Sequence, residues 1–567
     1  MIFKKMRSKI YFLISCILIN FFVSFQVHQN KYSLFLVILW LTSILLLILF
    51  SLSREKVKIN YSKIRFSKKT IFILLIILLP VLTRILNYDL SRIHTDDLIT
   101  GYFSAHYNLI NSNFFSAIPS DKGQWVSQFP TLYFVFQKLF FIIFGESLLT
   151  VKLSITPYIL VVSLTLFLIT KKILNEKSAF ISIIIISFFA PSLYLETLGL
   201  HFISSTAVFL IFFYFLILFL EKKKLFYSCL IGIFCGLSYL FYTSSYIALP
   251  ILLLFFTAFL VLSKNRPLIA KNFLMAVASF LIVITPFLSY MHTTENYYFT
   301  KRINQVNLIS GEWSHQKDEI EKGADPLSIF LRSLTSSINS LYLGGIGGHG
   351  GYTFNNLAFF DKYTFFLFIA GIISSLALCF KKREVMLILL IIFFSYITGI
   401  VLTIPPPAYH RFSLANPFLA IVMTVPFYLF FSLKKIKYIV NVIIFLVLII
   451  YFVSNQIYFM KMVQEPEGTH HGNSALEIAQ YINQNFLDRT IYVAAFPAFA
   501  FDKIFYFENK SKQLTTDYHK NLLYNFNPNE KYLYVIIFPD EFDEKFIAAD
   551  KNGRIINFSK NYSLFIN

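Results

Sequence analysis

Residues 70–98 read TIFILLIILLPVLTRILNYDLSRIHTDDL, an apolar run followed closely by two adjacent acidic residues, Asp96 and Asp97. The apolar part is near the length of a membrane-spanning helix, because about 20 helical residues cross the hydrocarbon core. Neighbouring carboxylates repel each other, so this pair needs a solvated niche, a cation or a chemical task at the membrane surface. The stretch predicts a membrane protein whose remaining chain holds this acidic loop in place.

The whole chain has the composition of a membrane protein. Of its 567 residues, 56% are hydrophobic and only 14% are charged, and the mean hydropathy is +0.64. Soluble proteins carry about 25% charged residues, so we expect a mainly α-helical, polytopic membrane protein. The net charge of +20 comes from Lys and Arg clustered in short loops between apolar runs. This distribution is typical of cytoplasmic loops, so nucleic acid is not expected as a partner.

Basic loops set the orientation of the predicted spans. The loop at 54–69 is rich in Lys and Arg and carries a single acidic residue, Glu55. We therefore place it and the N-terminus in the cytoplasm, and Asp96 then lies outside. Every short basic loop falls on the cytoplasmic side when about thirteen spans are assigned, which predicts a multi-pass protein of the plasma (inner) membrane. These spans cover 10–27, 33–52, 71–88, 150–170, 178–195, 202–220, 226–242, 244–262, 272–290, 363–380, 385–404, 413–433 and 436–455.

The sequence divides into two predicted domains. Residues 1–455 are expected to form the transmembrane domain, in which 89–149 and 291–362 are large external loops. The run at 131–144 is apolar but too short to span, so we expect an interfacial helix there. Residues 456–567 have the composition of a soluble protein and predict a small extracytoplasmic α/β domain.

The C-terminal region has a secondary-structure pattern of its own. Residues 474–486 predict an amphipathic helix, and 490–495 and 532–538 predict buried strands from their β-branched and aromatic content. The region has no glycine-rich nucleotide loop. We therefore expect it to serve recognition or stability rather than catalysis.

Asp96 and Asp97 are the first candidates for chemistry. An acidic residue ahead of a helix at 98–111 is also a good N-cap, so a purely structural role is one interpretation. The other is that one carboxylate is a general base, which takes a proton from an acceptor hydroxyl or amine. Its neighbour would then orient the acceptor or hold a divalent cation such as Mg²⁺ or Mn²⁺. Both interpretations can hold together.

Arg411 is the second candidate, in the run IPPPAYHRFSLANP at 404–417. It is expected at the external membrane boundary, where a lipid phosphate would lie, and its guanidinium can donate two parallel hydrogen bonds to a phosphate. His410 beside it is a candidate for the same role. Lys138 in the interfacial helix could also reach a phosphate. For Arg411 and Lys138 the alternative is ordinary snorkelling to headgroups.

Other polar side chains near the external ends of apolar runs are candidates for lining the same cavity. They are His94, Glu196, His201, Tyr409 and His349. His349 lies in the glycine-rich run 344–351, which is typical of a mobile or tightly turned loop that can gate a site. No His, Cys or Asp spacing typical of zinc is present, so no metal site is predicted from spacing.

The layout resembles the multi-span glycosyltransferases of the GT-C class, and most closely the protein O-mannosyltransferase and aminoarabinose-transferase group. Three elements carry the resemblance: Asp96-Asp97 where the family usually has Asp-Glu, the segment Phe144-Gly145-Glu146-Ser147 after the interfacial helix, and Arg411-Phe412 followed by Pro417. The chain departs from it at 128–130, where Gln-Phe-Pro replaces the Glu-Lys-Pro of aminoarabinose transferases. It also lacks the Trp-Trp-Asp motif of oligosaccharyltransferases in its C-terminal region.

The resemblance implies a polyprenyl-phosphate sugar as donor and a lipid, protein or glycan as acceptor at the external face. By it, Asp96 matches the catalytic Asp, Asp97 takes the neighbouring acidic position, and Arg411 binds the donor phosphate. Transfer would be a single inverting displacement with Asp96 as general base. Membrane lipids complete the expected partners.

Three other functions remain open at this point. A flippase or transporter would predict charged or Gly/Pro-broken spans and two related halves, whereas the spans here are largely uncharged. A lipid-linked polysaccharide polymerase or ligase would share the donor but depend on external Arg and His rather than on a carboxylate pair. A structural receptor gives no reason for Asp96, Asp97 and Arg411 to lie on one side.

Overall fold

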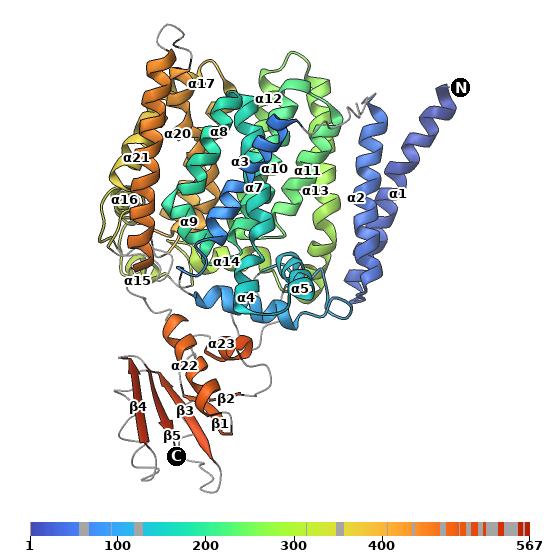
Figure 1. Cartoon of the computed structure of the whole chain (residues 1–567). Helices are drawn as coiled ribbons and strands as arrows, with labels where there is room; N and C mark the ends of the chain where they lie inside the picture. The colour runs from blue at the N-terminus through green and yellow to red at the C-terminus, as the bar shows by residue number, and fades with distance from the viewer. Residues whose placement is uncertain are drawn as a thin grey trace.

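The computed structural model describes residues 2–55, 67–91, 93–117, 129–312, 314–346, 356–404, 406–431, 433, 437–464, 472–486, 488–494, 501–508, 514–517, 531–537, 554–559 and 562–566. A bundle of helices forms the main body, and a small sheet with two helices lies below it (Figure 1). The first helix begins at the end of the bundle away from the sheet, so the two termini lie at opposite ends of the molecule.

Ten helical segments in the described ranges are long and apolar enough to cross a membrane. Six are regular helices or parts of them: Ile10–His28 in α1 (Ile2–His28), α2 (Leu34–Arg54), α10 (Phe202–Lys222), α13 (Arg266–Thr294), α17 (Lys362–Cys379) and Tyr438–Gln464 in α21 (Lys437–Gln464). Four are composite: α6 (Leu148–Leu153) with α7 (Thr156–Ile173), η3 (Thr243–Ile247) with α12 (Ala248–Leu262), α18 (Arg383–Tyr396) with η4 (Ile397–Val401), and α19 (Tyr409–Phe412), η5 (Ser413–Ala415) and α20 (Asn416–Phe430).

The other three expected spans are irregular. Helices α8 (Glu176–Phe188) and α9 (Ala190–Thr197) make one broken span, bent by 57°. Helix α3 (Lys68–Ile85) is apolar but carries basic residues at both ends, and α11 (Leu225–Ser238) is short, with 14 residues. The polytopic helical fold expected from the sequence is thus confirmed, with ten clear spans and an eleventh that is broken.

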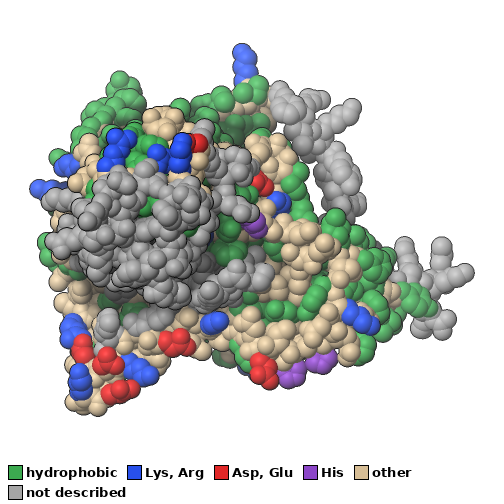
Figure 2. All heavy atoms as spheres, turned by 90° about the horizontal axis from the view of Figure 1, so that it is seen from below, with side chains coloured by type: hydrophobic (Ala, Val, Ile, Leu, Met, Phe, Trp, Pro, Cys, Tyr) green, Lys and Arg blue, Asp and Glu red, His purple; other side chains and the backbone are tan. Residues whose placement is uncertain are grey.

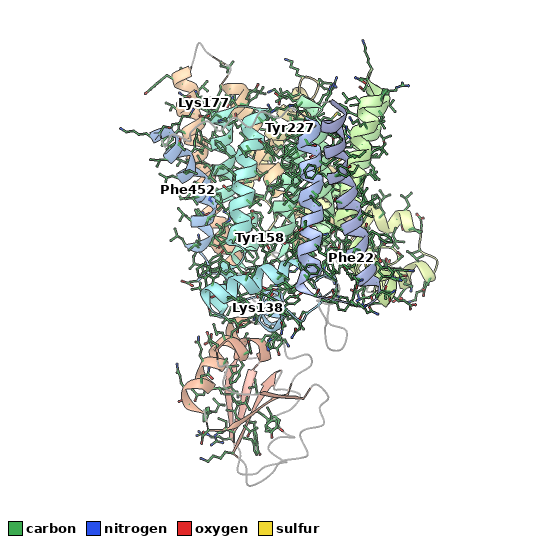
Figure 3. The ribbon with its side chains drawn as sticks, turned by 90° about the vertical axis from the view of Figure 1, so that its right-hand side faces the viewer. Phe22, Lys138, Tyr158, Lys177, Tyr227 and Phe452 are labelled. Atoms are coloured by element: carbon green, nitrogen blue, oxygen red, sulfur yellow. The ribbon has the colours of Figure 1, made fainter. Side chains whose placement is uncertain are left out.

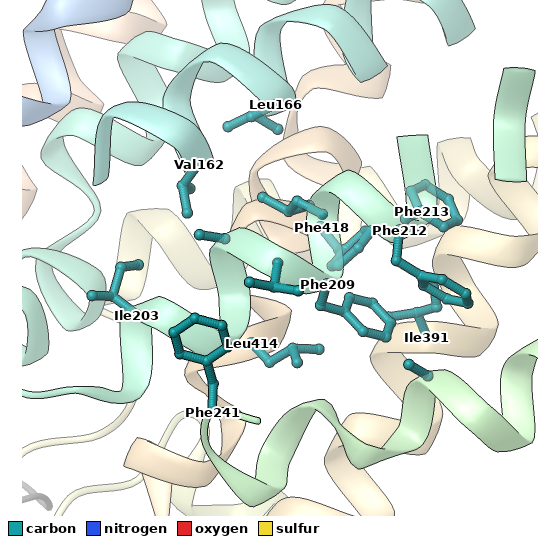
Figure 4. Packing of buried hydrophobic residues seen from close by; sticks show 14 of the residues in the cluster. Val162, Leu166, Ile203, Phe209, Phe212, Phe213, Phe241, Ile391, Leu414 and Phe418 are labelled. Carbon is teal, nitrogen blue, oxygen red and sulfur yellow. The ribbon is translucent and has the colours of Figure 1, made fainter. Parts of the chain in front are cut away.

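The middle of the bundle is built on α10 and α20. In the span that includes α20, 78% of the residues are buried, and in α10 72%, against 28% in α1. Figure 4 shows Phe209 and Phe213 of α10 packed beside Phe418 of α20. Helices α11 and α13 pack so closely that a Cβ atom added to Gly232 would lie 2.0 Å from the Ala276 carbonyl oxygen. Small residues let two helix backbones approach closely, and such packing matters in a membrane because the hydrophobic effect does not drive helices together there.

The large loops form short helices at the lower edge of the bundle. The first loop contains α4 (Thr95–His106) and α5 (Leu132–Phe144), and the second contains α14 (Tyr298–Val306), α15 (His315–Glu321) and α16 (Pro326–Ser340). Helix α5 matches the expected interfacial segment and has 13 residues. Figure 3 shows Lys138 of α5 at this end and Lys177 of α8 at the opposite end.

The C-terminal region forms a five-stranded sheet with two helices. Its order is β2-β1-β3-β5-β4, with β1 parallel to β2 and β3, and β5 antiparallel to β3 and β4. The predicted helix and both predicted strands are confirmed as α22, β1 and β3. The elements are α22 (Gly472–Asn485), β1 (Thr490–Ala494), α23 (Phe501–Glu508), β2 (Leu514–Asp517), β3 (Tyr532–Ile537), β4 (Arg554–Ser559) and β5 (Tyr562–Ile566).

Helix α23 joins this region to the bundle by packing on α4 and α6. Ile504 and Phe505 are fully buried in one hydrophobic cluster with Leu98 of α4 and Val151 of α6. The Tyr506 hydroxyl donates a hydrogen bond to Glu146 Oε2 at 3.0 Å. The C-terminal region therefore contacts the helix that carries the acidic pair. On this face, seen in Figure 2, basic, acidic and histidine side chains are mixed.

Candidate functional site

The acidic pair lies in the first turn of α4. The N-cap is His94, whose Nδ1 accepts a hydrogen bond from the Asp96 backbone N–H at 3.1 Å. The capping role considered for the carboxylates thus belongs to His94, which is fully buried. Asp96 and Asp97 lie just inside the helix, where its positive end favours negative charge.

Asp97 is the deeper of the two carboxylates. Only 2% of it is exposed, and its Oδ1 accepts a hydrogen bond from the Leu98 backbone N–H at 2.8 Å. Burial raises the pKa of Asp97 well above its ordinary value, because the charged form loses its hydration. The charge of Lys152 acts in the opposite direction.

Lys152 is itself a buried cation, held at the start of the α6–α7 span. Its Nζ donates to the carbonyl oxygens of Tyr88 and Ser91, both at 2.8 Å, and to the Ser91 hydroxyl at 2.9 Å. These three acceptors fix the ammonium group near Asp97. The positions of Lys152 and Asp97 are consequently set by the loop between α3 and α4.

Asp96 is half-buried, and the cation that acts on it is Arg302, whereas Lys152 acts on Asp97. Burial raises its pKa to about 7, and the positive charge of Arg302 opposes that rise. A carboxylate with a pKa near neutrality can accept a proton at physiological pH and release it again. Strongly shifted carboxylates in a recess are typical of functional sites.

Arg302 on α14 connects the acidic pair to the second candidate region. Its positive charge acts on Asp96, on His201 and on Arg411. The chain after α14 is joined to the segment before Arg411 by two backbone hydrogen bonds. They run from Leu308 N to Leu402 O at 2.8 Å and from Ile404 N to Val306 O at 2.9 Å.

Arg411 is buried with unused donors. It is 5% exposed, and Nη1 donates to the Ile404 carbonyl oxygen at 2.9 Å. Its Nε and Nη2 have no hydrogen-bond acceptor at good geometry among the described residues, and the Tyr242 hydroxyl is the side-chain group that interacts with the guanidinium. A buried charge without partners is costly. An anion that accepted hydrogen bonds from Nε and Nη2 would offset this cost.

Arg411 also lines a cavity of about 460 Å³. The walls come from η3, α12, α14, η4 and the segment that follows it, and Arg411 is the single charged residue among them. Most of the lining is apolar or carries a hydroxyl, including Ile247, Phe299, Ile303 and Leu402. Such a cavity suits an apolar chain with an anionic group at the arginine end.

Three further candidates pack around Arg411 without lining this cavity. The His410 ring lies 5.1 Å from that of Phe202, and the His201 ring lies 5.1 Å from that of Tyr242. Burial lowers the pKa of His201 to about 3, so its imidazole is neutral. The Tyr409 hydroxyl donates to the Ser340 carbonyl oxygen at 2.8 Å. These contacts thus involve Phe202, Tyr242 and Ser340 rather than the cavity.

The remaining candidates lie elsewhere. Lys138 Nζ donates to the Ala105 carbonyl oxygen and pairs with Glu146 at 3.3 Å, at the far end of α4 from Asp96. Glu196 Oε2 accepts from Arg84 Nε at 2.7 Å, at the bend between α8 and α9. His349 falls outside the described residues. The expected phosphate and cavity roles of Lys138 and Glu196 have no support in these contacts.

The acidic pair is a poor divalent-cation site. A Mg²⁺ or Mn²⁺ ion needs about six oxygen ligands. No group of three or more His, Cys, Asp or Glu side chains that could hold a metal occurs within the described ranges. Lys152 and Arg302 already act on the two carboxylates. We therefore assign no step to a metal ion.

Sequence reasoning missed Arg302 and Lys152. The sequence does point to Lys152, because an ionisable residue at the start of an otherwise apolar span usually has a structural or functional role. Arg302 carries a weaker signal, since it lies in the long loop at 291–362 among other polar residues. Its position depends on the pairing of 306–308 with 402–404, which no local pattern reveals.

Comparisons with known proteins support the fold. The family model described as dolichyl-phosphate-mannose-protein mannosyltransferase matches residues 128–290. The structure of ArnT from Cupriavidus metallidurans in the apo state has a TM-score of 0.59 at 11% identity, covering 88% of this chain and 98% of that one. The same protein bound to undecaprenyl phosphate has a TM-score of 0.58, with the same identity and coverage. An oligosaccharyltransferase of Archaeoglobus fulgidus has a TM-score of 0.49 at 13% identity, covering 87% and 74%. No curated protein sequence matches the chain.

Proposed function

We propose that this chain, which has the polytopic fold of the GT-C glycosyltransferases, transfers a sugar from a polyprenyl-phosphate donor to an acceptor at the extracytoplasmic face. The observation that carries the proposal is that the positive charge of Arg302 acts on two unusual groups. One is Asp96, with a pKa of about 7, and the other is Arg411, buried with two unused donor atoms.

The donor would bind with its phosphate at Arg411 and its isoprenoid chain along the apolar cavity. The free Nε and Nη2 groups of Arg411 supply the two parallel donors that a phosphate accepts. Arg302 adds positive charge from α14. The ArnT structure with bound undecaprenyl phosphate supports this class of ligand for the fold.

The reaction would be one displacement at the anomeric carbon. Asp96 takes the proton of the acceptor hydroxyl or amine, whose heteroatom forms the new bond to the anomeric carbon with inversion. The bond from that carbon to the phosphate oxygen breaks, and its electron pair stays on the phosphate. Arg411 and Arg302 stabilise the charge that develops there. Asp97, held beside Lys152, would orient the acceptor.

The transporter alternative gains one observation, since α8–α9 is a broken span with a buried Arg84–Glu196 pair. Arg84 also donates to the carbonyl oxygens of Ser187 and Ile186 at 2.7 and 2.9 Å, and Glu196 accepts from Ser192 at 2.5 Å. These groups satisfy one another and leave none for a transported substrate. A polysaccharide polymerase or ligase shares the donor and differs in its acceptor.

The test uses the full chain in lipid nanodiscs with radiolabelled polyprenyl-phosphate hexoses and a crude acceptor extract. Wild type should release label from the lipid, and Asp96→Asn should lower the rate by a factor of about 10³ or more, because the base is lost. Asp318→Asn, a matched change at an exposed residue of α15, should stay within about twofold. Equal rates for wild type and Asp96→Asn, in folded proteins, would remove Asp96 as the base. Absence of turnover with every donor would favour transport.

A further inference from the structure

A second cavity, of about 570 Å³, lies at the end of the bundle opposite the C-terminal region. It is formed where α10 ends, where α12 turns into α13 and where α17 turns into α18. Four basic residues line it: Lys223, Lys264, Lys381 and Arg383. The proposed transfer site uses none of them.

These four cations are exposed and lack carboxylate partners. In the described part of the chain, no ion pair joins any of them to an acidic residue, and Glu384 is the single acid in the lining. Lys171 and Lys172 at the same end of the bundle behave differently, pairing with Glu176 and Glu221. The lining of the cavity thus carries four positive charges and one negative charge, that of Glu384.

The backbone adds to this positive character. Helix α18 has 14 residues and begins at Arg383, and its N-cap residue, Lys382, makes no side-chain capping hydrogen bond. The positive end of this helix therefore faces the same region as the basic side chains, and Glu384 in its first turn offsets part of that charge. A bound anion would receive both the side-chain charges and the helix dipole.

The opposite wall of the cavity is apolar. Phe259 and Leu220 line it, and Leu262 is 79% exposed at its edge. All three lie at the ends of membrane-spanning helices, at the depth where acyl chains meet headgroups. A free phosphate would leave this apolar edge in water, whereas a phospholipid would cover it.

We propose that this cavity is a binding site for the headgroup of an anionic phospholipid. The phosphate lies among Lys223, Lys264, Lys381 and Arg383, and the acyl chains cover Phe259 and Leu262. Basic pockets between transmembrane helices are suited to anionic headgroups, and lipids with two phosphates fit several cations best. The site is independent of the proposed transfer reaction.

The test is lipid binding by native mass spectrometry on the full chain in detergent, with tetraoleoyl cardiolipin, dioleoyl phosphatidylglycerol and dioleoyl phosphatidylcholine as probes. The double variant Lys264→Gln/Arg383→Gln should weaken cardiolipin binding about 30-fold and phosphatidylglycerol binding less, with phosphatidylcholine unchanged. The control Arg266→Gln/Lys271→Gln removes two exposed charges from the same end without touching the cavity, and should change binding less than threefold.

Two outcomes would overturn the proposal. Equal losses in both double variants would show that the lipid responds to the general charge of this face. Displacement of cardiolipin by inorganic pyrophosphate at equal concentration would show that a free phosphate, not a lipid, is the preferred ligand. A cavity variant that fails to fold is replaced by the single change Lys264→Gln, for which about a fivefold loss is expected.

Discussion

The molecule buries two arginines in different ways. Arg84 is completely buried, and its guanidinium donates to Glu196, to Thr83 and to two backbone carbonyl groups. Arg411 is 5% exposed and donates one hydrogen bond, to Ile404. The first arginine is satisfied by the chain itself, and the second is not. The difference separates a charge that supports the fold from one that, under the proposed function, binds the donor phosphate.

The strongest test of this contrast is to substitute each arginine and to measure both the stability and the activity of the variant. Arg84→Gln leaves Glu196 buried without its cation, so we expect a loss of about 3–5 kcal/mol in the free energy of unfolding. Arg411→Gln should leave thermal stability unchanged or higher while lowering turnover about 10²- to 10³-fold. Thermal unfolding followed by fluorescence, together with label release from the lipid donor, measures both. Comparable destabilisation by the two changes would contradict the contrast.

Arg302 sharpens the comparison, because its charge acts on both the proposed base, Asp96, and the proposed phosphate-binding residue, Arg411. If ionised Asp96 is the base, kcat/KM should rise with pH through about 7. Arg302 lowers the pKa of Asp96, so Arg302→Gln should move this rising limb to higher pH, by about one pH unit. The measurement is kcat/KM across pH 5.5 to 9. Arg332→Gln, at an exposed ion pair with Glu319, serves as the control, and an unmoved limb in Arg302→Gln would refute the link.

Lys152 belongs with Arg84, since its hydrogen bonds are all made to the chain. Lys152→Met should cost about 1–3 kcal/mol, because the carbonyl oxygens of Tyr88 and Ser91 lose their donor. It also leaves Asp97 without its cation. The double variant Lys152→Met/Asp97→Asn should recover about 1 kcal/mol of that loss. Additive losses in the double-mutant cycle would show that the two charges do not interact.

The smallest effect is expected at the contact between the bundle and the C-terminal region. Glu146 accepts a hydrogen bond from Tyr506 and pairs with Lys138, and both contacts are partly exposed. Tyr506→Phe should cost about 0.5–1.5 kcal/mol and speed hydrogen exchange in α23. Tyr438→Phe, a highly exposed residue on α21, should change nothing. Unchanged exchange in α23 would show that apolar burial alone holds the contact.

Composition and periodicity predicted the bundle, the short helix α5 and the C-terminal sheet, because each depends on local pattern. Asp96 and Arg411 could be proposed because each follows or precedes an apolar run at the same side of the membrane. Their electrostatic connection could not, since it depends on α14, whose place is set by contacts between residues distant in the chain. The break between α8 and α9 was also missed, although Pro191 lies at the start of α9.

The bridge between 306–308 and 402–404 has a consequence for how this fold changes over evolutionary time. It is made by backbone N–H and carbonyl groups, which every residue except proline supplies in full. Substitutions along both segments are therefore neutral for the bridge as long as proline is avoided. The register between the two loops can persist while the side chains around it are replaced.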